Sequence, residues 1–278
     1  MLRNMKDIEG FAIHATDGIL GQVKDFYFDD SSWVVRYFVV ETSLWHTNRR
    51  TLISPMSMGI PNWSERLIPA ALTQAQVRNG PDIDTDKPVS RQHEMGYSGY
   101  YGYPNYWGGG GLWGAGMYPD MLQGGLDRTA ADRGNQGPRR VPKHANHEAG
   151  ETRRQNDLHL RSANSVMRYY VHATDGDIGH VAGILVEEET WAIRYMIVNT
   201  SNWWLGHEVL VAPEWVEDVY WAESKLNVAL SREAIKHAPE YHSHEPITRE
   251  HEKLLHAFHG QPGYWPGEPT HGSNILYA

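Results

Sequence analysis

The chain contains one long sequence pattern twice, and this repeat limits the folds that it can adopt. The pentapeptide HATDG occupies residues 14–18 and returns at residues 172–176, an offset of 172 − 14 = 158 residues. A repeat of this length is a whole folding unit, unlike the periods of about 20–50 residues in solenoid proteins. We therefore predict two copies of one domain, which can pack about a local two-fold axis as the protomers of a dimer do. The same offset, without insertion or deletion, relates the pairs Leu2/Leu160, Arg3/Arg161, Trp33/Trp191, Arg36/Arg194, Pro55/Pro213, Trp63/Trp221 and Trp107/Trp265.

Length and composition narrow the class of protein. At 278 residues the chain has room for about two domains, in agreement with the repeat. Its formal net charge of −9 offers no positive field for phosphate groups, so we expect no nucleic-acid partner. The absence of cysteine excludes disulfides, thiolate metal sites and thiol nucleophiles, and fits a reducing compartment. Because no stretch approaches the roughly 18 apolar residues of a membrane span, we predict a cytoplasmic protein, with association to a membrane through a partner as an alternative.

Each copy is predicted to fold as short strands with tight turns. In the first copy we expect strands at 11–15, 22–29, 34–42, 50–54 and 67–70, with a hairpin turn at the Asp-Gly pair 17–18. Residues 34–42 and 192–200 are apolar at both odd and even positions, so both faces of each strand are apolar. Each strand should therefore have a core on one face and other protein on the other. Five such strands in under about a hundred residues favour a small antiparallel barrel.

A short helix should follow each barrel. Thr73 with Gln76 three residues later makes a capping box, and Ser231 opens the counterpart helix in the second copy. The fold class is therefore mainly β, with two small antiparallel barrels related by internal duplication.

Composition shifts divide the chain into four parts. We expect a first barrel unit at 1–95, a Gly/Tyr-rich arm and polar linker at 96–157, a second barrel unit at 158–253 and a tail at 254–278. The aromatic stretch 97–117 could pack on a barrel or on a second chain. Residues 112–157 are expected to form a flexible linker, because they contain too few apolar side chains to offset ordering entropy.

The turn residues are predicted to be structural. Asp17 with Gly18, and Asp175 with Gly176, supply the turn geometry of Asp-Gly hairpins rather than catalytic carboxylates. His14 and His172 precede these turns. They are expected to bond turn backbone, although a two-histidine metal site across the pseudo-axis is an alternative.

The late histidines are weak metal candidates. His242, His244 and His251 lie close in sequence, but their spacing matches no structural zinc pattern, and the first copy has Asp84 and Asp86 where the second has His242 and His244. We therefore predict no cofactor and no dedicated metal site.

Arginine and tryptophan recur in the strand predicted to be apolar on both faces. Arg36 and Arg194 are expected either to pair with an acidic residue of the other unit or to lie exposed at a barrel edge beside tryptophan. Trp33 and Trp191 should pack in a core or an interface.

Common enzyme motifs are missing from the sequence. There is no Gly-x-Ser-x-Gly elbow, no phosphate loop, no dinucleotide glycine motif and no His-Glu-x-x-His. The glycines at 108–111 do not open a predicted helix. The sequence therefore predicts a protein that is not an enzyme.

Together, these segments resemble the PRC-barrel family. The matching residues are ATDGxxG at 15–21, the turn at 29–30, WxVRYFVV at 33–40 and LISP at 52–55, and the second copy matches at 173–179, 191–198 and 210–213. Gly21 and Gly179 correspond to the family's glycine that starts the second strand. The chain departs from the photosynthetic reaction-centre H subunit, for which the family is named, in lacking its membrane helix. It departs from a related ribosome-maturation factor in lacking that factor's N-terminal domain and in being acidic.

The resemblance implies a non-catalytic bacterial adaptor or scaffold. It links the chain by kinship to photosynthesis and electron transport, and to a ribosome-maturation factor whose barrel docks on other macromolecules. We expect packing of the two barrels on each other and protein partners of unknown identity, with a homo-oligomer as an open alternative. The alternatives for function are a small-ligand or metal-binding sensor and an RNA-processing, ribosome-associated factor.

Overall fold

β-strands make up most of the regular structure in the part of the chain that the structure describes. The computed structural model describes residues 1–42, 49–81, 89, 91–107, 109–119, 159–200, 207–243 and 245–265. By the contacts between residues, the chain divides into two units. Unit 1 contains Arg3–Arg168 and Gly183–Tyr195, and unit 2 contains Tyr169–Ala182 and Met196–Ala278. Two segments of the second sequence copy therefore belong to unit 1.

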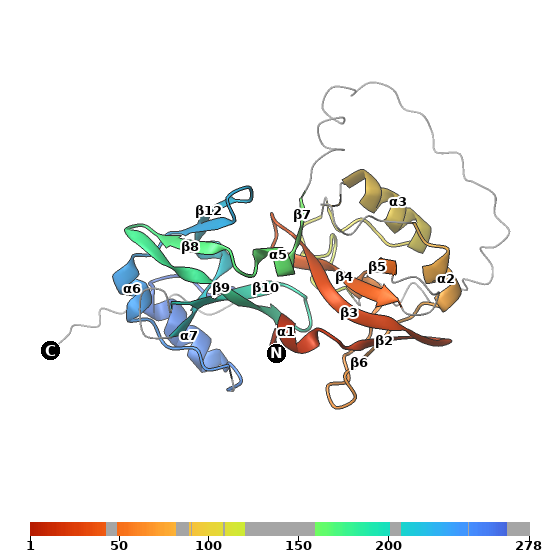
Figure 1. Ribbon diagram of the computed structural model, residues 1–278, viewed down its shortest axis with the longest axis horizontal. Helices are drawn as coiled ribbons and strands as arrows, with labels where there is room; N and C mark the ends of the chain where they lie inside the picture. The colour runs from red at the N-terminus through yellow and green to blue at the C-terminus, as the bar shows by residue number, and fades with distance from the viewer. Residues whose placement is uncertain are drawn as a thin grey trace, which may run out of the picture. The chain divides into compact units, whose positions relative to one another are not determined.

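The first sheet has the strand order β5-β4-β3-β2-β6, and β7 pairs with β3 beside this path. Its longest strand, β3, pairs with β4 along one edge and with β2 and β7 along the other (Figure 1). All of these pairs are antiparallel except β2 with β6. The bounds are β2 Ala12–Ala15, β3 Gly18–Asp29, β4 Val34–Thr42, β5 Arg49–Ile53, β6 Leu67–Pro69 and β7 Leu160–Ser162.

The second sheet has the order β11-β10-β9-β8-β13-β12, and β1 (Leu2–Asn4) pairs with β9 beside this path. The pair β13 with β8 is parallel, as β6 is with β2. Several element bounds recur at the 158-residue offset, and β9 begins and ends 158 residues after β3. The bounds are β8 Tyr170–Ala173, β9 Gly176–Glu187, β10 Ile193–Asn199, β11 Glu208–Val211, β12 Val216–Tyr220 and β13 Lys225–Val228.

The expectation of purely antiparallel barrels is wrong, because both sheets are mixed. After β5 the chain passes through the 3-10 turn η1 (Pro55–Ser57), and Met58 forms an isolated bridge with Ala70 beside β6. A parallel pair of strands needs a crossover connection. This segment supplies it, and β6 therefore runs beside β2 in the same direction. Among the described residues, no ladder of hydrogen bonds joins β5 to β6 or β11 to β12, so neither sheet is a hydrogen-bonded closed barrel.

The predicted short helices are present. The capping box at Thr73 and Gln76 is confirmed at the start of α2 (Gln74–Arg78), and Ser231 caps α6 (Arg232–Lys236). A single turn follows the first strand of each copy: α1 (Met5–Ile8) and α5 (Ala163–Val166). No helix in the described ranges is long and apolar enough to cross a membrane.

Each copy also has a longer helix that the sequence analysis does not predict. These are α3 (Arg91–Tyr101) and α7 (Arg249–Phe258). Helix α3 crosses the expected boundary at residue 95, and the residues after it remain in unit 1, where the side chain of Trp113 is 2% exposed. The described part of the aromatic stretch therefore packs on unit 1, while residues 120–157 of the expected linker lie outside the described residues.

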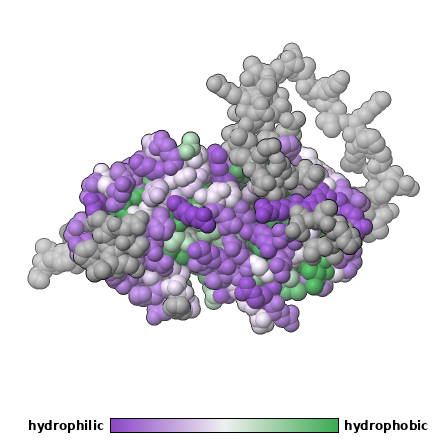
Figure 2. All heavy atoms as spheres, in the orientation of Figure 1, coloured by the Kyte–Doolittle hydropathy of each residue, from purple (hydrophilic) through white to green (hydrophobic). Residues whose placement is uncertain are grey.

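Strand β4 is buried on both faces, as its sequence predicts. Tyr37 packs edge-to-face on Tyr97 of α3, at 5.2 Å between ring centroids. The next residue, Phe38, points to the opposite face and packs edge-to-face on Trp191, at 4.8 Å. One face is thus covered by the helix of its own copy and the other by a residue of the second copy, within unit 1. The face of the molecule drawn in Figure 2 is otherwise largely hydrophilic, with apolar side chains in small patches.

Candidate interaction site and buried polar network

The first strand of the second copy completes the sheet of unit 1. Strand β7 pairs antiparallel with the end of β3, with Leu160 opposite Asp29 and Ser162 opposite Tyr27. The backbone N–H of Asp30 extends this ladder to the carbonyl of His159, at 2.9 Å. Without β7 this half of β3 would be an unpaired edge, which proteins usually cover.

Two ion pairs accompany the added strands, and their residues are related by the repeat offset. Arg161 Nε donates to Asp30 Oδ2 at 2.8 Å. Arg3 Nε donates to Glu188 Oε2 at 3.2 Å, and the carbonyl of Met1 accepts from the backbone N–H of Glu188. Arg3 lies 158 residues before Arg161, and Asp30 lies 158 residues before Glu188. In each copy, therefore, the arginine of the first strand (β1 or β7) pairs with the acid that follows the long strand (β9 or β3) of the other copy.

A single backbone bridge joins the two segments that follow these acids in the chain. Val34 forms an isolated antiparallel bridge with Ala192, which lies 158 residues later. The N–H of Val35 donates to the carbonyl of Trp191 at 2.9 Å, and the N–H of Ile193 donates to the carbonyl of Trp33 at 2.7 Å. Both tryptophans have left-handed backbone conformations, with φ of 53° and 58°. Such conformations are strained for bulky residues and need support from their surroundings.

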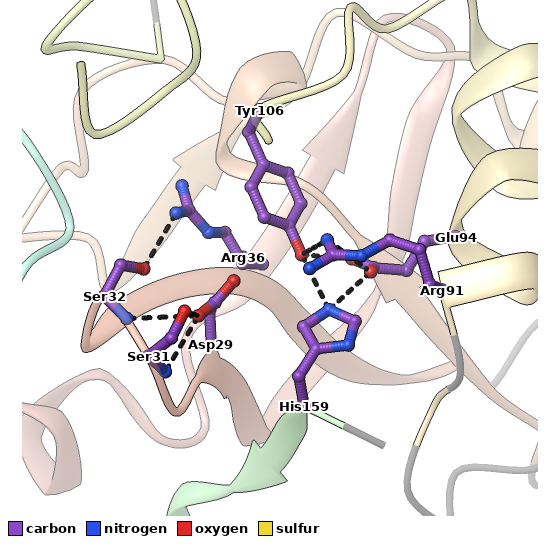
Figure 3. Close-up of polar contacts among 8 residues, drawn as sticks. All are labelled: Asp29, Ser31, Ser32, Arg36, Arg91, Glu94, Tyr106 and His159. Atoms are coloured by element: carbon purple, nitrogen blue, oxygen red, sulfur yellow. Dashed lines mark hydrogen bonds and ion pairs between the residues drawn. The ribbon is translucent and has the colours of Figure 1, made fainter. Parts of the chain in front are cut away.

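A buried carboxylate joins α3, the aromatic stretch and the residue before β7 (Figure 3). Glu94 accepts a hydrogen bond from Tyr106 Oη at 2.5 Å and lies 2.7 Å from His159 Nε2. Arg91 Nη1 lies 3.2 Å from the same carboxylate. The Glu94 side chain is fully buried, and that of His159 is 6% exposed. Burial and the charge of Glu94 raise the pKa of Tyr106 well above its usual value, which keeps its hydroxyl a donor.

Arg36 lies beside this network, buried rather than exposed. It is 3% exposed, and its Nη1 donates to the carbonyl of Leu112 at 2.6 Å while its Nη2 donates to Ser32 Oγ at 3.0 Å. Its guanidinium lies over the ring of Tyr106, 3.8 Å from the centroid. Burial alone would raise the pKa of Asp29, but hydrogen bonds from Ser31 and the charge of Arg36 outweigh burial and lower it.

Arg194 has an acidic partner in its own copy. It lies 2.6 Å from Glu187, the residue that corresponds to Asp29. Arg194 thus pairs with an acid of its own copy, whereas Arg36 donates to Ser32 and to the carbonyl of Leu112, and neither arginine is exposed at a barrel edge. For Arg194, the short reach from the end of β9 to the start of β10 favours the local acid.

The hairpin aspartates do more than shape their turns. Asp17 Oδ1 accepts from the backbone N–H of Gln74 at 2.8 Å, and Asp175 Oδ1 accepts from that of Arg232 at 2.7 Å. Each aspartate therefore ties its hairpin to the first residue of α2 or α6, where an acidic side chain is favourable. Gly18 and Gly176 follow with φ of 140° and 142°.

Gly21 and Gly179 are each the fourth residue of a strand, β3 and β9, rather than the first as the resemblance implied, and a close backbone approach requires glycine at both positions. A Cβ on Gly21 would overlap the carbonyl of Glu41 on the paired strand β4. A Cβ on Gly179 would overlap the carbonyl of Asn199, and Gly179 also has a φ of 149°. Both observations explain why the two positions carry glycine.

The histidine candidates do not come together. His172 Nδ1 lies 2.7 Å from Asp177 Oδ1 rather than on turn backbone, and His14 is exposed. His242 lies 3.9 Å from Glu240, His251 is on α7, and His244 lies outside the described residues. Among the described residues, no group of three or more histidine or acidic side chains could hold a metal ion.

A pocket of about 640 Å³ opens in unit 1 beside the ion pair of Arg3 and Glu188. Glu188 and Glu189 supply its carboxylates. Much of the remaining lining is apolar, and includes Pro55, Met58, Ile60, Pro61 and Trp191. Its volume is in the range that accommodates ligands of drug size.

The buried carboxylates of α3 and α7 were missed at the level of sequence. In the second copy, Glu252 accepts from Tyr264 Oη at 2.7 Å and pairs with Arg249 at 2.9 Å, as Glu94 does with Tyr106 and Arg91. A sequence signal exists for both sites: Arg-x-His-Glu at 91–94 and 249–252, each followed by Tyr-Trp.

In comparisons with known proteins, no family model matches the chain and no curated protein matches it. The resemblance to PRC barrels therefore stays a prediction.

Proposed function

We propose that the chain is a non-catalytic adaptor or scaffold of the PRC-barrel type, made of two related halves. The path of the chain supports a barrel-like curl in the second sheet. Strands β11 and β12 lie at opposite ends of a six-strand order, yet only residues 212–215 connect them. From Val211 to Val216 an extended chain spans at most about 18 Å. The edges of a flat six-stranded sheet would lie about 24 Å apart.

The proposal rests mainly on the structural role of the buried charged groups. Glu94, Arg36 and His159 have the chemistry of catalytic residues, but each is at most 5% exposed. Their hydrogen bonds join α3, β4 and the residue before β7, so their interactions stabilise the arrangement of backbone elements. Such a braced framework suits a protein that presents surfaces to partners, as the barrel of the reaction-centre H subunit does in the family that the chain resembles.

Affinity capture of the intact chain tests the proposal. We expect a defined protein partner that remains bound in stoichiometric amount through gel filtration. The complex should not depend on added metal. Elution without any partner, together with turnover of a small molecule at the pocket, would show that the chain is an enzyme instead.

A further inference from the structure

The pocket of unit 1 has an apolar floor and an apolar rim. Trp191 and Met58 are each 4% exposed and belong to the core, whereas Ile60 is 85% exposed. Tyr118, also in the lining, is 40% exposed. Exposed apolar side chains around a concave surface are typical of interaction sites.

The two carboxylates of the pocket differ in their partners. Glu188 is occupied on both oxygens, because Oε2 accepts from Arg3 and Oε1 accepts from Trp63 Nε1 at 2.7 Å. Glu189 is exposed and makes no hydrogen bond or ion pair with its side chain among the described residues. The pocket therefore has one carboxylate that is free to pair with a cation.

We infer that this pocket binds a peptide segment of a partner protein in which lysine or arginine stands next to apolar residues. The apolar side chains would pack on Ile60 and Trp191, and the cationic group would pair with Glu189. The net charge of −9 also favours the approach of a basic partner. This inference rests on the proposed adaptor function, since it names the docking site and the chemistry of its partner.

Peptide binding to the intact chain provides the test. The probe is a fluorescent peptide of alternating leucine and lysine, measured by anisotropy, beside the same peptide with glutamate in place of lysine. We expect Glu189→Lys to weaken binding of the lysine peptide about five- to tenfold at low salt and to improve binding of the glutamate peptide. Glu223→Lys makes the same charge change at an exposed residue outside the pocket and should alter either affinity less than about twofold. Ile60→Ser should weaken both peptides.

Other outcomes would overturn the inference. Equal effects of Glu189→Lys and Glu223→Lys would mean that the peptide binds by general charge attraction. Displacement of the peptide by micromolar hexylamine would assign the pocket to a small amine. If the partner captured by the intact chain is retained by Glu189→Lys, the adaptor function stands and this docking site is wrong. If the lysine peptide binds as expected but no partner is captured, the adaptor function fails instead.

Discussion

At the scale of single residues, the buried carboxylates of α3 and α7 depend strongly on the polar side chains around them. Glu94 has Arg91, Tyr106 and His159 among its polar neighbours, and its counterpart Glu252 has the equivalents of the first two, Arg249 and Tyr264. Removing one member of a buried ionic cluster lowers the free energy of unfolding strongly, because the remaining charged partners are left unpaired in a medium of low polarity.

We expect Glu94→Gln to lower the free energy of unfolding by about 2–4 kcal/mol, because it leaves Arg91 and His159 without their carboxylate. Glu252→Gln should also lower stability, because it removes the carboxylate that pairs with Arg249. The exposed Glu250, also on α7, is the control and should change stability by less than about 0.5 kcal/mol when it is replaced by glutamine. Urea denaturation of the three variants gives the comparison. A Glu94→Gln protein as stable as the control variant would mean that the buried polar network does not stabilise unit 1.

The close approach of backbone at Gly179 predicts a second stability effect. Gly179→Val should destabilise by about 2–3 kcal/mol, because its Cβ would overlap the Asn199 carbonyl and its φ of 149° is unsuited to valine. Gly99 on α3 is a contrasting glycine, with open space around it, so Gly99→Ala should stabilise by about 1 kcal/mol. Thermal unfolding of both variants measures the two opposite shifts. An unchanged melting temperature for Gly179→Val would remove the packing argument for this glycine.

At the scale of elements, the sequence predicts strands better than helices. Strand 34–42 has the predicted bounds, because its unbroken apolar run is a strong local signal. The parallel pairs are not predictable in this way, since they depend on where the chain crosses after β5 and not on any local pattern. Helix α3 contains Gly96 and Gly99, which disfavour a helix, and it is stabilised by packing of Tyr97 and Glu94 against unit 1. For the candidate site, the sequence identified Arg36 but missed Glu94, because burial of a polar residue has no local pattern.

Helix α7 ends in a cluster of histidines that is expected to make unit 2 sensitive to acid. Burial, together with the neighbouring His256, lowers the pKa of His259 to about 4, and burial lowers the pKa of His256. Both rings lie against Trp215, at 5.1 and 4.8 Å between centroids. A histidine whose folded pKa is depressed contributes stability that is present above its unfolded pKa, near 6.5, and is lost as pH falls toward the folded value. Unit 2 should therefore lose stability between about pH 6.5 and pH 4.

Replacing His259 by phenylalanine tests this dependence. The buried Nδ1 of His259 has no hydrogen-bond partner among the described residues, so a phenyl ring should be tolerated at this position. We expect His259→Phe to gain stability relative to the parent at pH 5 and to gain less at pH 7, measured by urea denaturation at each pH. His237→Gln, at an exposed histidine, should leave the pH dependence nearly unchanged. A parallel pH profile for parent and His259→Phe would exclude His259 as the source of acid sensitivity.

At the scale of the whole molecule, unit 1 cannot be completed by the first sequence copy alone. Strand β7, which pairs with β3, and the turn at 188–191, which contacts Arg3 and β4, both come from the second copy. In a symmetric homodimer, each protomer would donate the same strand to the other. The two halves are therefore expected to depend on each other through noncovalent contacts, whatever the residues between them do.

Cleavage of the chain between the copies tests this dependence. A protease site inserted after Gly137, within the residues that the structure does not describe, would yield fragments 1–137 and 138–278. We expect the fragments to elute together from gel filtration as a 1:1 complex with unchanged circular dichroism, because the ladder of β7 on β3 and the ion pair of Arg161 with Asp30 survive the cut. Arg161→Glu should weaken the cleaved complex, and the double variant Arg161→Glu with Asp30→Arg should recover part of the loss, since it restores opposite charges at 2.8 Å. Fragments of the parent protein that separate without denaturant would mean that the added strand contributes too little to hold the copies together.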